Sequence, residues 1–217
     1  MNAIASPFER YRHIVVEGPI GAGKTSLARR LSERLSANLV LEQPEMNPFL
    51  SRFYAERERW ALATQIEFLF QRTGLLAEAA QALQAGHRVV SDFILEKDPL
   101  FASLNLTEDE ARLYEQIFAQ LRPAPLKPDL VIYLQAQPDV LIERVRKRGM
   151  DAERKITEAY LATVSERYAS FFHTYEASPL FVINAEVLNP VEEEDDFELI
   201  LQRLQAMRGY REYFSYA

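Results

Sequence analysis

Short apolar runs recur along the chain, separated by longer stretches in which apolar residues repeat at helical spacing. Runs rich in branched residues, at 13–17, 39–41, 89–91, 130–134 and 180–183, predict five strands. Helices are predicted over 27–35, 60–85, 107–121, 139–148, 157–176 and 197–207. Because strands without polar alternation are buried on both faces, the pattern predicts an α/β fold with a five-stranded parallel sheet between helices.

Local signals place several helix ends. Thr107 and Glu110 have capping-box spacing, and Gly86 and Gly149 favour helix C-termini. We interpret the acidic stretch 192–196 as the solvated N-terminal end of the last helix, where carboxylates are favourable, and not as a binding site. Without a repeat or a linker, residues 1–217 are expected to form a single domain.

Composition narrows the classes of function. The chain has 217 residues, no cysteine, a formal net charge of −7 and a pI of about 5.2, which excludes disulfide frameworks and argues against a nucleic acid polymer as partner. No apolar run approaches the ~20 residues of a membrane span, and the first residues lack a secretory h-region. We therefore expect a cytoplasmic enzyme without a membrane role.

A Gly-rich segment follows the first predicted strand and opens the first predicted helix. It fits the pattern G-x-x-x-x-G-K-[ST], in which backbone N–H groups and a helix N-terminus surround the phosphates of a nucleotide such as ATP. Lys24 is expected to reach the β and γ phosphates, and Thr25 to bind Mg²⁺. The predicted ATP-binding residues are Gly18, Pro19, Ile20, Gly21, Ala22, Gly23, Lys24, Thr25 and Ser26.

The chain also resembles the deoxynucleoside kinase family, from about Tyr11 to about Leu204, and most closely its bacterial deoxyadenosine/deoxyguanosine kinase-like branch. The resemblance is carried by residues 18–26, 41–50, 53–54, 60–72, 90–102, 128–134 and 144–153. It implies a five-stranded parallel sheet, transfer of the ATP γ-phosphate to a nucleoside 5′-hydroxyl, Mg²⁺ dependence and a homodimer. The bacterial branch alone implies a purine preference.

The acceptor hydroxyl needs a carboxylate that positions it and receives its proton. The family has this acid just after the second strand, directly before a proline. Gln43 stands there in this chain, flanked by Glu42 and Glu45. We take Glu42 as the first candidate, with Glu45 as the alternative.

The resemblance assigns further residues to the acceptor. It makes Gln65 the reader of the nucleobase and Arg72 its neighbour, two turns along one helix. Tyr54 and Glu153 correspond to contacts with the sugar 3′-hydroxyl, and Phe101 to a wall of the base site. Without the resemblance, Gln65 and Tyr54 are interpreted as ordinary surface residues.

Asp92 ends the third predicted strand, where a carboxylate can hold Mg²⁺ or its waters. The family has an arginine after this acid, but Phe93 follows here. Lys97 or an arginine of the lid is expected to compensate. Lys97 and Asp98 also remain alternatives for a base contact.

Residues 144–156 correspond to the family's lid. Arg144 and Arg148 share a helix face with Lys147 beside them, so this basic end can stabilise charge on the γ-phosphate. Without the resemblance, Arg144, Lys147 and Arg148 would be interpreted as solvated charges at a helix C-terminus. In the lid, we expect Arg144 and Arg148 to be catalytic together with Lys24 and Glu42.

The sequence thus predicts an ATP:deoxynucleoside 5′-phosphotransferase. A nucleoside monophosphate kinase is the first alternative, although it needs further arginines around an acceptor phosphate. The second alternative is a nucleotide-sensing P-loop protein with little turnover, which Gln43 and Phe93 at catalytic positions make plausible.

Overall fold

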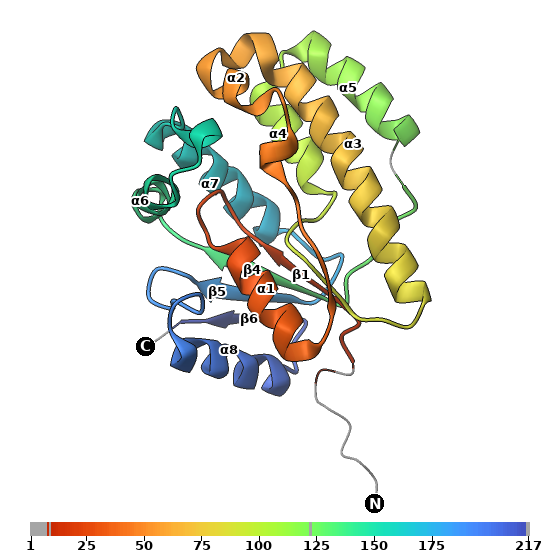
Figure 1. Cartoon of the computed structure of the whole chain (residues 1–217), viewed down its shortest axis with the longest axis vertical. Helices are drawn as coiled ribbons and strands as arrows, with labels where there is room; N and C mark the ends of the chain where they lie inside the picture. The colour runs from red at the N-terminus through yellow and green to blue at the C-terminus, as the bar shows by residue number, and fades with distance from the viewer. Residues whose placement is uncertain (1–7, 9, 122, 216–217) are drawn as a thin grey trace, which may run out of the picture.

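The computed structural model describes residues 8, 10–121 and 123–215. Its parallel sheet has the strand order β2-β3-β1-β4-β5-β6. The strands are β1 (His13–Glu17), β2 (Asn38–Val40), β3 (Val89–Ser91), β4 (Leu130–Gln135), β5 (Leu180–Asn184) and β6 (Arg211–Phe214). Helices cover both faces of the sheet, so the predicted α/β fold is confirmed (Figure 1).

The sheet has six strands, and the prediction of five was wrong. β6 pairs with β5 in parallel, with Arg211 opposite Leu180. None of its four residues is buried, in contrast to the fully buried β1 and β3. A strand at the edge of a sheet needs no apolar run, so the pattern that identified the other strands does not identify this one.

The helices are α1 (Lys24–Leu35), α2 (Leu50–Ala55), α3 (Arg57–Gln84), α4 (Lys97–Asn105), α5 (Glu108–Leu121), α6 (Pro138–Arg148), α7 (Glu158–His173) and α8 (Glu194–Ala206), with short 3₁₀ turns at Pro44–Met46 and Asp151–Glu153. The sequence pattern predicts all of these helices except α2 and α4. Both begin without a side-chain cap and are short, with six and nine residues. At α5 the predicted capping box is present, since Glu110 accepts from the Thr107 N–H at 2.9 Å.

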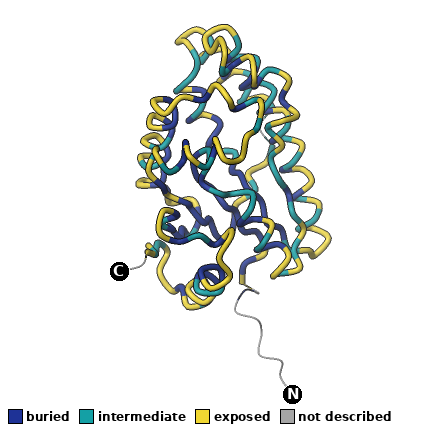
Figure 2. Tube along the Cα trace, turned by 60° about the vertical axis from the view of Figure 1, so that its left-hand side comes forward, coloured by how far each residue is buried: buried dark blue, intermediate teal, exposed yellow. Residues whose placement is uncertain are grey.

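One cluster of buried apolar residues joins the central strands to α1, α7 and α8, and buried residues fill the interior of the trace (Figure 2). On one face α1 lies beside α8, where Arg30 places its guanidinium 4.1 Å from the Phe197 ring centre and also pairs with Glu194. α7 packs on β4, with the rings of Tyr133 and Phe172 stacked at 4.2 Å. No helix in the described ranges is long and apolar enough to cross a membrane.

The carboxyl ends of three neighbouring strands define the candidate site. Glu17 ends β1, Glu42 lies two residues after β2, and Asp92 directly follows β3. Since the strands are parallel, these carboxylates lie at the same edge of the sheet, where open α/β sheets bind their ligands.

Candidate active site

The loop between β1 and α1 has the backbone form that phosphate binding requires. Gly21 and Gly23 have φ angles of 87° and 94°, and a Cβ on Gly21 would lie 2.6 Å from the Leu141 carbonyl oxygen. α1 begins at Lys24, and its N-cap residue Gly23 makes no side-chain bond to the first N–H groups, which are the donors that bind phosphate in such loops. The Lys24 ammonium lies 3.1 Å from the Pro19 carbonyl oxygen, and burial lowers its pKa.

Two cavities meet at this loop. Gly21, Lys24, Thr25 and Arg148 line both of them. The first cavity also contains most of the acceptor residues predicted from the sequence: Glu42, Tyr54, Gln65, Arg72, Asp92, Phe101 and Glu153. The loop therefore separates two spaces that can each hold one of two reactants.

The second cavity lies between the Gly-rich loop and the segment that follows β5. Arg144 lines it and donates to the Ala185 carbonyl oxygen at 2.7 Å. Lys147 also lines it and pairs with Glu192 at 3.0 Å on the surface. The wall also includes Leu134 and residues 188–191, and the latter carry no motif and were missed in the sequence analysis.

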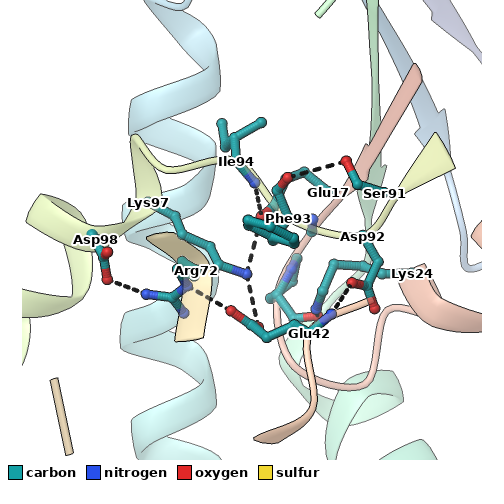
Figure 3. A network of polar contacts seen from close by, with 12 residues as sticks. Glu17, Lys24, Glu42, Arg72, Ser91, Asp92, Phe93, Ile94, Lys97 and Asp98 are labelled. Atoms are coloured by element: carbon teal, nitrogen blue, oxygen red, sulfur yellow. Dashed lines mark hydrogen bonds and ion pairs between the residues drawn. The ribbon is translucent and has the colours of Figure 1, made fainter. Parts of the chain in front are cut away.

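Of the two candidate acids, Glu42 lines the first cavity and Glu45 is exposed outside it. The Glu42 backbone N–H donates to Oδ1 of Asp92 at 2.8 Å. Its carboxylate accepts from Nε of Arg72 at 2.6 Å and from Nζ of Lys97 at 3.0 Å (Figure 3). The side chain is therefore held by two cations that come from different helices.

These two cations decide the charge of Glu42. Burial raises the pKa of its carboxyl, but the positive charges of Arg72 and Lys97 outweigh burial and hold the pKa at about 2. Glu42 is therefore ionised at neutral pH.

Lys97 and Glu17 form a buried ion pair beside Glu42. The Lys97 ammonium lies 3.2 Å from Oε1 of Glu17, which also accepts the N–H of Ile94 at 3.2 Å. Burial lowers the pKa of Lys97, but the charges of Glu17 and Glu42 raise it above its ordinary value. The sequence analysis missed Glu17, although a charge that ends an apolar strand just before the loop is a visible signal.

Phe93 supplies no cation at this site, because its buried ring is uncharged. Lys97, four residues later, brings a positive charge to Glu42 instead. Asp98, its alternative as a base contact, does not line the cavity and is fully buried behind Arg72, with which it forms an ion pair.

Asp92 and Thr25 offer two oxygens side by side, since the Thr25 hydroxyl donates to Oδ2 of Asp92 at 2.5 Å. Burial and the nearby charge of Glu42 raise the pKa of Asp92. Hydroxyl and carboxylate oxygens are ligands that Mg²⁺ prefers. In the described part of the chain, no group of three or more His, Asp or Glu side chains could hold a metal ion by itself.

The cavity is closed by residues of α3, α4 and the lid segment. Gln65 is 4% exposed, and its Nε2 has no hydrogen-bond partner among the described residues. Phe101 forms part of the wall nearby. At the lid, Arg148 forms an ion pair with the buried Glu153, and Tyr54 lies in the same cavity.

This geometry can be compared with known proteins. The model of the deoxynucleoside kinase family matches residues 14–207. The chain belongs to the deoxynucleoside kinase family. The resemblance predicted from the sequence is therefore confirmed.

Other members of the family are similar over most of their length. Deoxyguanosine kinase from Bacillus subtilis is 31% identical over 199 residues, which cover 89% of this chain and 96% of the relative. Deoxyadenosine kinase from Lactobacillus acidophilus is 31% identical over 191 residues, which cover 81% of this chain and 86% of the relative. The structure of deoxyadenosine kinase from M. mycoides with bound dATP superimposes with a TM-score of 0.77 at 28% identity, covering 88% and 98% of the two chains.

Proposed function

We propose that this member of the deoxynucleoside kinase family transfers the γ-phosphate of ATP to the 5′-hydroxyl of a deoxynucleoside. The observation that carries the proposal is the pair of cavities that share Lys24 and Thr25, with the ionised Glu42 carboxylate held by Arg72 and Lys97 in the first of them. ATP occupies the cavity beside residues 185–192, and the deoxynucleoside occupies the cavity of Glu42. The names of the relatives support a deoxynucleoside as the acceptor.

In the proposed reaction the 5′ oxygen forms a bond to the γ phosphorus, and the bond from that phosphorus to the bridging oxygen breaks, so that ADP leaves. Glu42 orients the hydroxyl and receives its proton as the bond forms. Lys24 and the first N–H groups of α1 hold the phosphates. Positioning and charge neutralisation therefore supply most of the rate enhancement.

Mg²⁺ neutralises the charge shared by the β and γ phosphates when it is bound. Thr25 would hold the ion directly, and Asp92 directly or through water, since their oxygens lie 2.5 Å apart. Arg148 lines both cavities and Arg144 lines the ATP side. Both arginines therefore stabilise the charge of the transferring group from the lid segment 144–156.

Acceptor selection is proposed to depend on the buried end of the first cavity. Gln65 reads the nucleobase, because its buried amide has an unused donor that an acceptor atom on a base can satisfy. Phe101 walls the base, and Tyr54 and Glu153 contact the 3′-hydroxyl. A preference for purines is supported by the deoxyguanosine and deoxyadenosine kinases among the relatives.

The charges of the first cavity also bear on the two alternatives. A monophosphate as acceptor needs arginines that are free to bind its phosphate, but Arg72 is held between Glu42 and Asp98, and the neighbouring Lys97 between Glu17 and Glu42. A sensor with little turnover needs no ionised carboxylate beside the phosphate loop. Both alternatives are therefore weaker than the kinase.

The test is incubation of the purified protein with Mg-ATP and, in separate samples, each deoxynucleoside, each deoxynucleoside monophosphate or no acceptor. ADP formation that depends on a deoxynucleoside is the expected result. ADP formation that requires a monophosphate would support the first alternative. Hydrolysis without acceptor, or none at all, would support the sensor.

We also propose that the protein is a cytoplasmic homodimer that pairs through α3 and α5. These helices pack against each other, and each carries an exposed apolar side chain: Phe70 is 55% exposed and Leu113 is 47% exposed. A second copy of the chain would cover this surface.

A further inference from the structure

Arg30 connects α1 with the segment that forms one wall of the second cavity. Its Nη1 donates to the Pro190 carbonyl oxygen at 2.7 Å and lies 3.5 Å from the Glu193 carbonyl oxygen. Pro190 lines the cavity and belongs to the turns between β5 and α8. Since α1 begins in the phosphate loop, one side chain ties two walls of the same cavity together.

The guanidinium of Arg30 is held on its other sides by α8, which lies beside α1 (Figure 1). It forms an ion pair with Glu194 and lies 4.1 Å from the centre of the Phe197 ring. The Arg30 side chain is 22% exposed, so its contact with the Pro190 carbonyl is partly shielded from water. A charged donor forms a stronger hydrogen bond than a neutral one, and these contacts orient the planar group without any help from a nucleotide.

The segment that Arg30 binds also meets the phosphate loop directly. A Cβ on Gly23 would lie 3.4 Å from Cγ2 of Val191, the residue after Pro190. Because the loop binds the phosphates, the sugar and the base of ATP extend along the rest of the wall, which includes residues 188–192. The position of this segment relative to the loop therefore decides how well the whole nucleotide fits.

Arg34, one turn further along α1, provides an internal comparison. It lies 3.5 Å from the same Glu194 carboxylate and 5.5 Å from the centre of the same Phe197 ring, and it also pairs with Glu198. These three partners belong to α8, and none of them lines the cavity. The two arginines thus share their contacts with α8, but Arg30 alone of this pair also holds the cavity wall.

We propose that Arg30 is a positioning residue for the phosphate donor, which sets the distance between the phosphate loop and the wall that receives the base of ATP. The proposal rests on the proposed function, because it takes the second cavity as the ATP site. Arg30 lines neither cavity, so it acts through residues 188–193 and not on the reacting atoms. It should therefore change the affinity for ATP and leave the chemical step and the acceptor little changed.

The test measures the Kd of Mg-ATP by titration calorimetry for the wild type, Arg30→Met, Arg30→Lys and the matched control Arg34→Met. The same proteins are titrated with inorganic tripolyphosphate and Mg²⁺, a probe that can occupy the phosphate loop but has no base. Methionine keeps an apolar side chain over Phe197 without a donor, whereas lysine can still donate to one carbonyl. Circular dichroism checks that each variant folds.

We expect the Kd of ATP to rise roughly 10-fold in Arg30→Met, the effect of one lost hydrogen bond from a charged group, and to rise less in Arg30→Lys. Arg34→Met should bind ATP as the wild type does, and the affinity for tripolyphosphate should be equal in all four proteins. An equal Kd of ATP in Arg30→Met and the wild type would overturn the proposal. Equal losses for ATP and tripolyphosphate would also overturn it, because Arg30 would then act through α1 itself.

Steady-state kinetics give a second readout. In Arg30→Met the KM for ATP should rise by about the same factor as the Kd, while kcat and the KM for the deoxynucleoside stay close to the wild type. A lower kcat with an unchanged KM for ATP would contradict a positioning role. The binding measurement needs no acceptor, so a raised Kd without any phosphorylated nucleoside would support the role of Arg30 and refute the proposed function alone.

Discussion

The Lys97 ammonium lies 3.0 Å from Oε2 of Glu42 and 3.2 Å from Oε1 of Glu17. One buried cation on α4 thus joins the end of β1 to the acid that follows β2. Resemblance to the family places an arginine at position 93, but the Phe93 ring carries no charge and its centre lies 5.9 Å from the Lys97 ammonium. We infer that Lys97 takes over the charge of that missing arginine.

Replacement of Lys97 tests this role. Lys97→Met should lower kcat by roughly 10²- to 10³-fold, the effect of one lost donor at a developing charge. It should also destabilise the fold by about 3–5 kcal/mol, because Glu17 loses the charge that compensates its burial. Lys97→Arg should retain more of the wild-type kcat and more of the wild-type stability than Lys97→Met. The measurements are steady-state kinetics and urea denaturation.

The exposed Lys127→Met is the matched control and should change neither quantity. A Lys97→Met enzyme with unchanged kcat would show that the missing arginine is replaced elsewhere.

The two neighbouring acids provide a second comparison. Glu42→Gln should lower kcat by roughly 10²- to 10⁴-fold, the range for a lost general base. Glu45→Gln should leave kcat close to the wild type, since Glu45 is exposed and does not line the cavity. Single-turnover rates with saturating ATP separate the chemical step from product release. Small, equal effects of both changes would contradict Glu42 as the proton acceptor.

Stability should depend on pH through Glu42. Its pKa of about 2 in the folded protein is below its ordinary value of 4.5, so folding favours the ionised form. The resulting stabilisation, up to about 3 kcal/mol, is complete above pH 4.5 and is lost as the pH falls toward 2. Urea denaturation should therefore show the advantage of wild type over Glu42→Gln shrinking between pH 4.5 and 3. An advantage that grows on acidification would refute the assignment.

The exposed apolar side chains of α3 and α5 predict a change of assembly. Phe70→Glu should convert a dimer into a monomer, because a charge cannot be buried unpaired at the interface. Light scattering after size-exclusion chromatography measures the mass. Tyr210→Glu serves as a control on a residue that is about equally exposed but distant in sequence. A wild type that is already monomeric would contradict the dimer.

Sequence alone predicted the parts of the fold that depend on continuous apolar runs and on local caps. The strands from β1 to β5 and the capping box of α5 belong to this group. β6 was missed because half of an edge strand faces away from the core, and its sequence Arg-Glu-Tyr-Phe is mixed. α2 and α4 were missed because six and nine residues are too few to show a clear helical repeat of apolar residues.

The residues of the site also divide into those that the sequence predicted and those that only the fold brings together. The phosphate motif is contiguous, so its residues could be predicted from spacing, although α1 begins at Lys24, three residues before the predicted start. The network of Glu17, Lys97 and Glu42 joins three elements that lie far apart in the sequence, and only the order of the strands brings them together. Asp98 and Lys97 are adjacent in the chain, and only side-chain direction separates their roles.

Phosphorus-31 NMR of a reaction with Mg-ATP and deoxyadenosine or deoxyguanosine tests the central claim most directly. We predict a 5′-monophosphate resonance that grows in equal amount with ADP, and that is absent with the Lys24→Ala variant. Inorganic phosphate without a nucleotide product, or product formation that is unchanged in Lys24→Ala, would contradict the account.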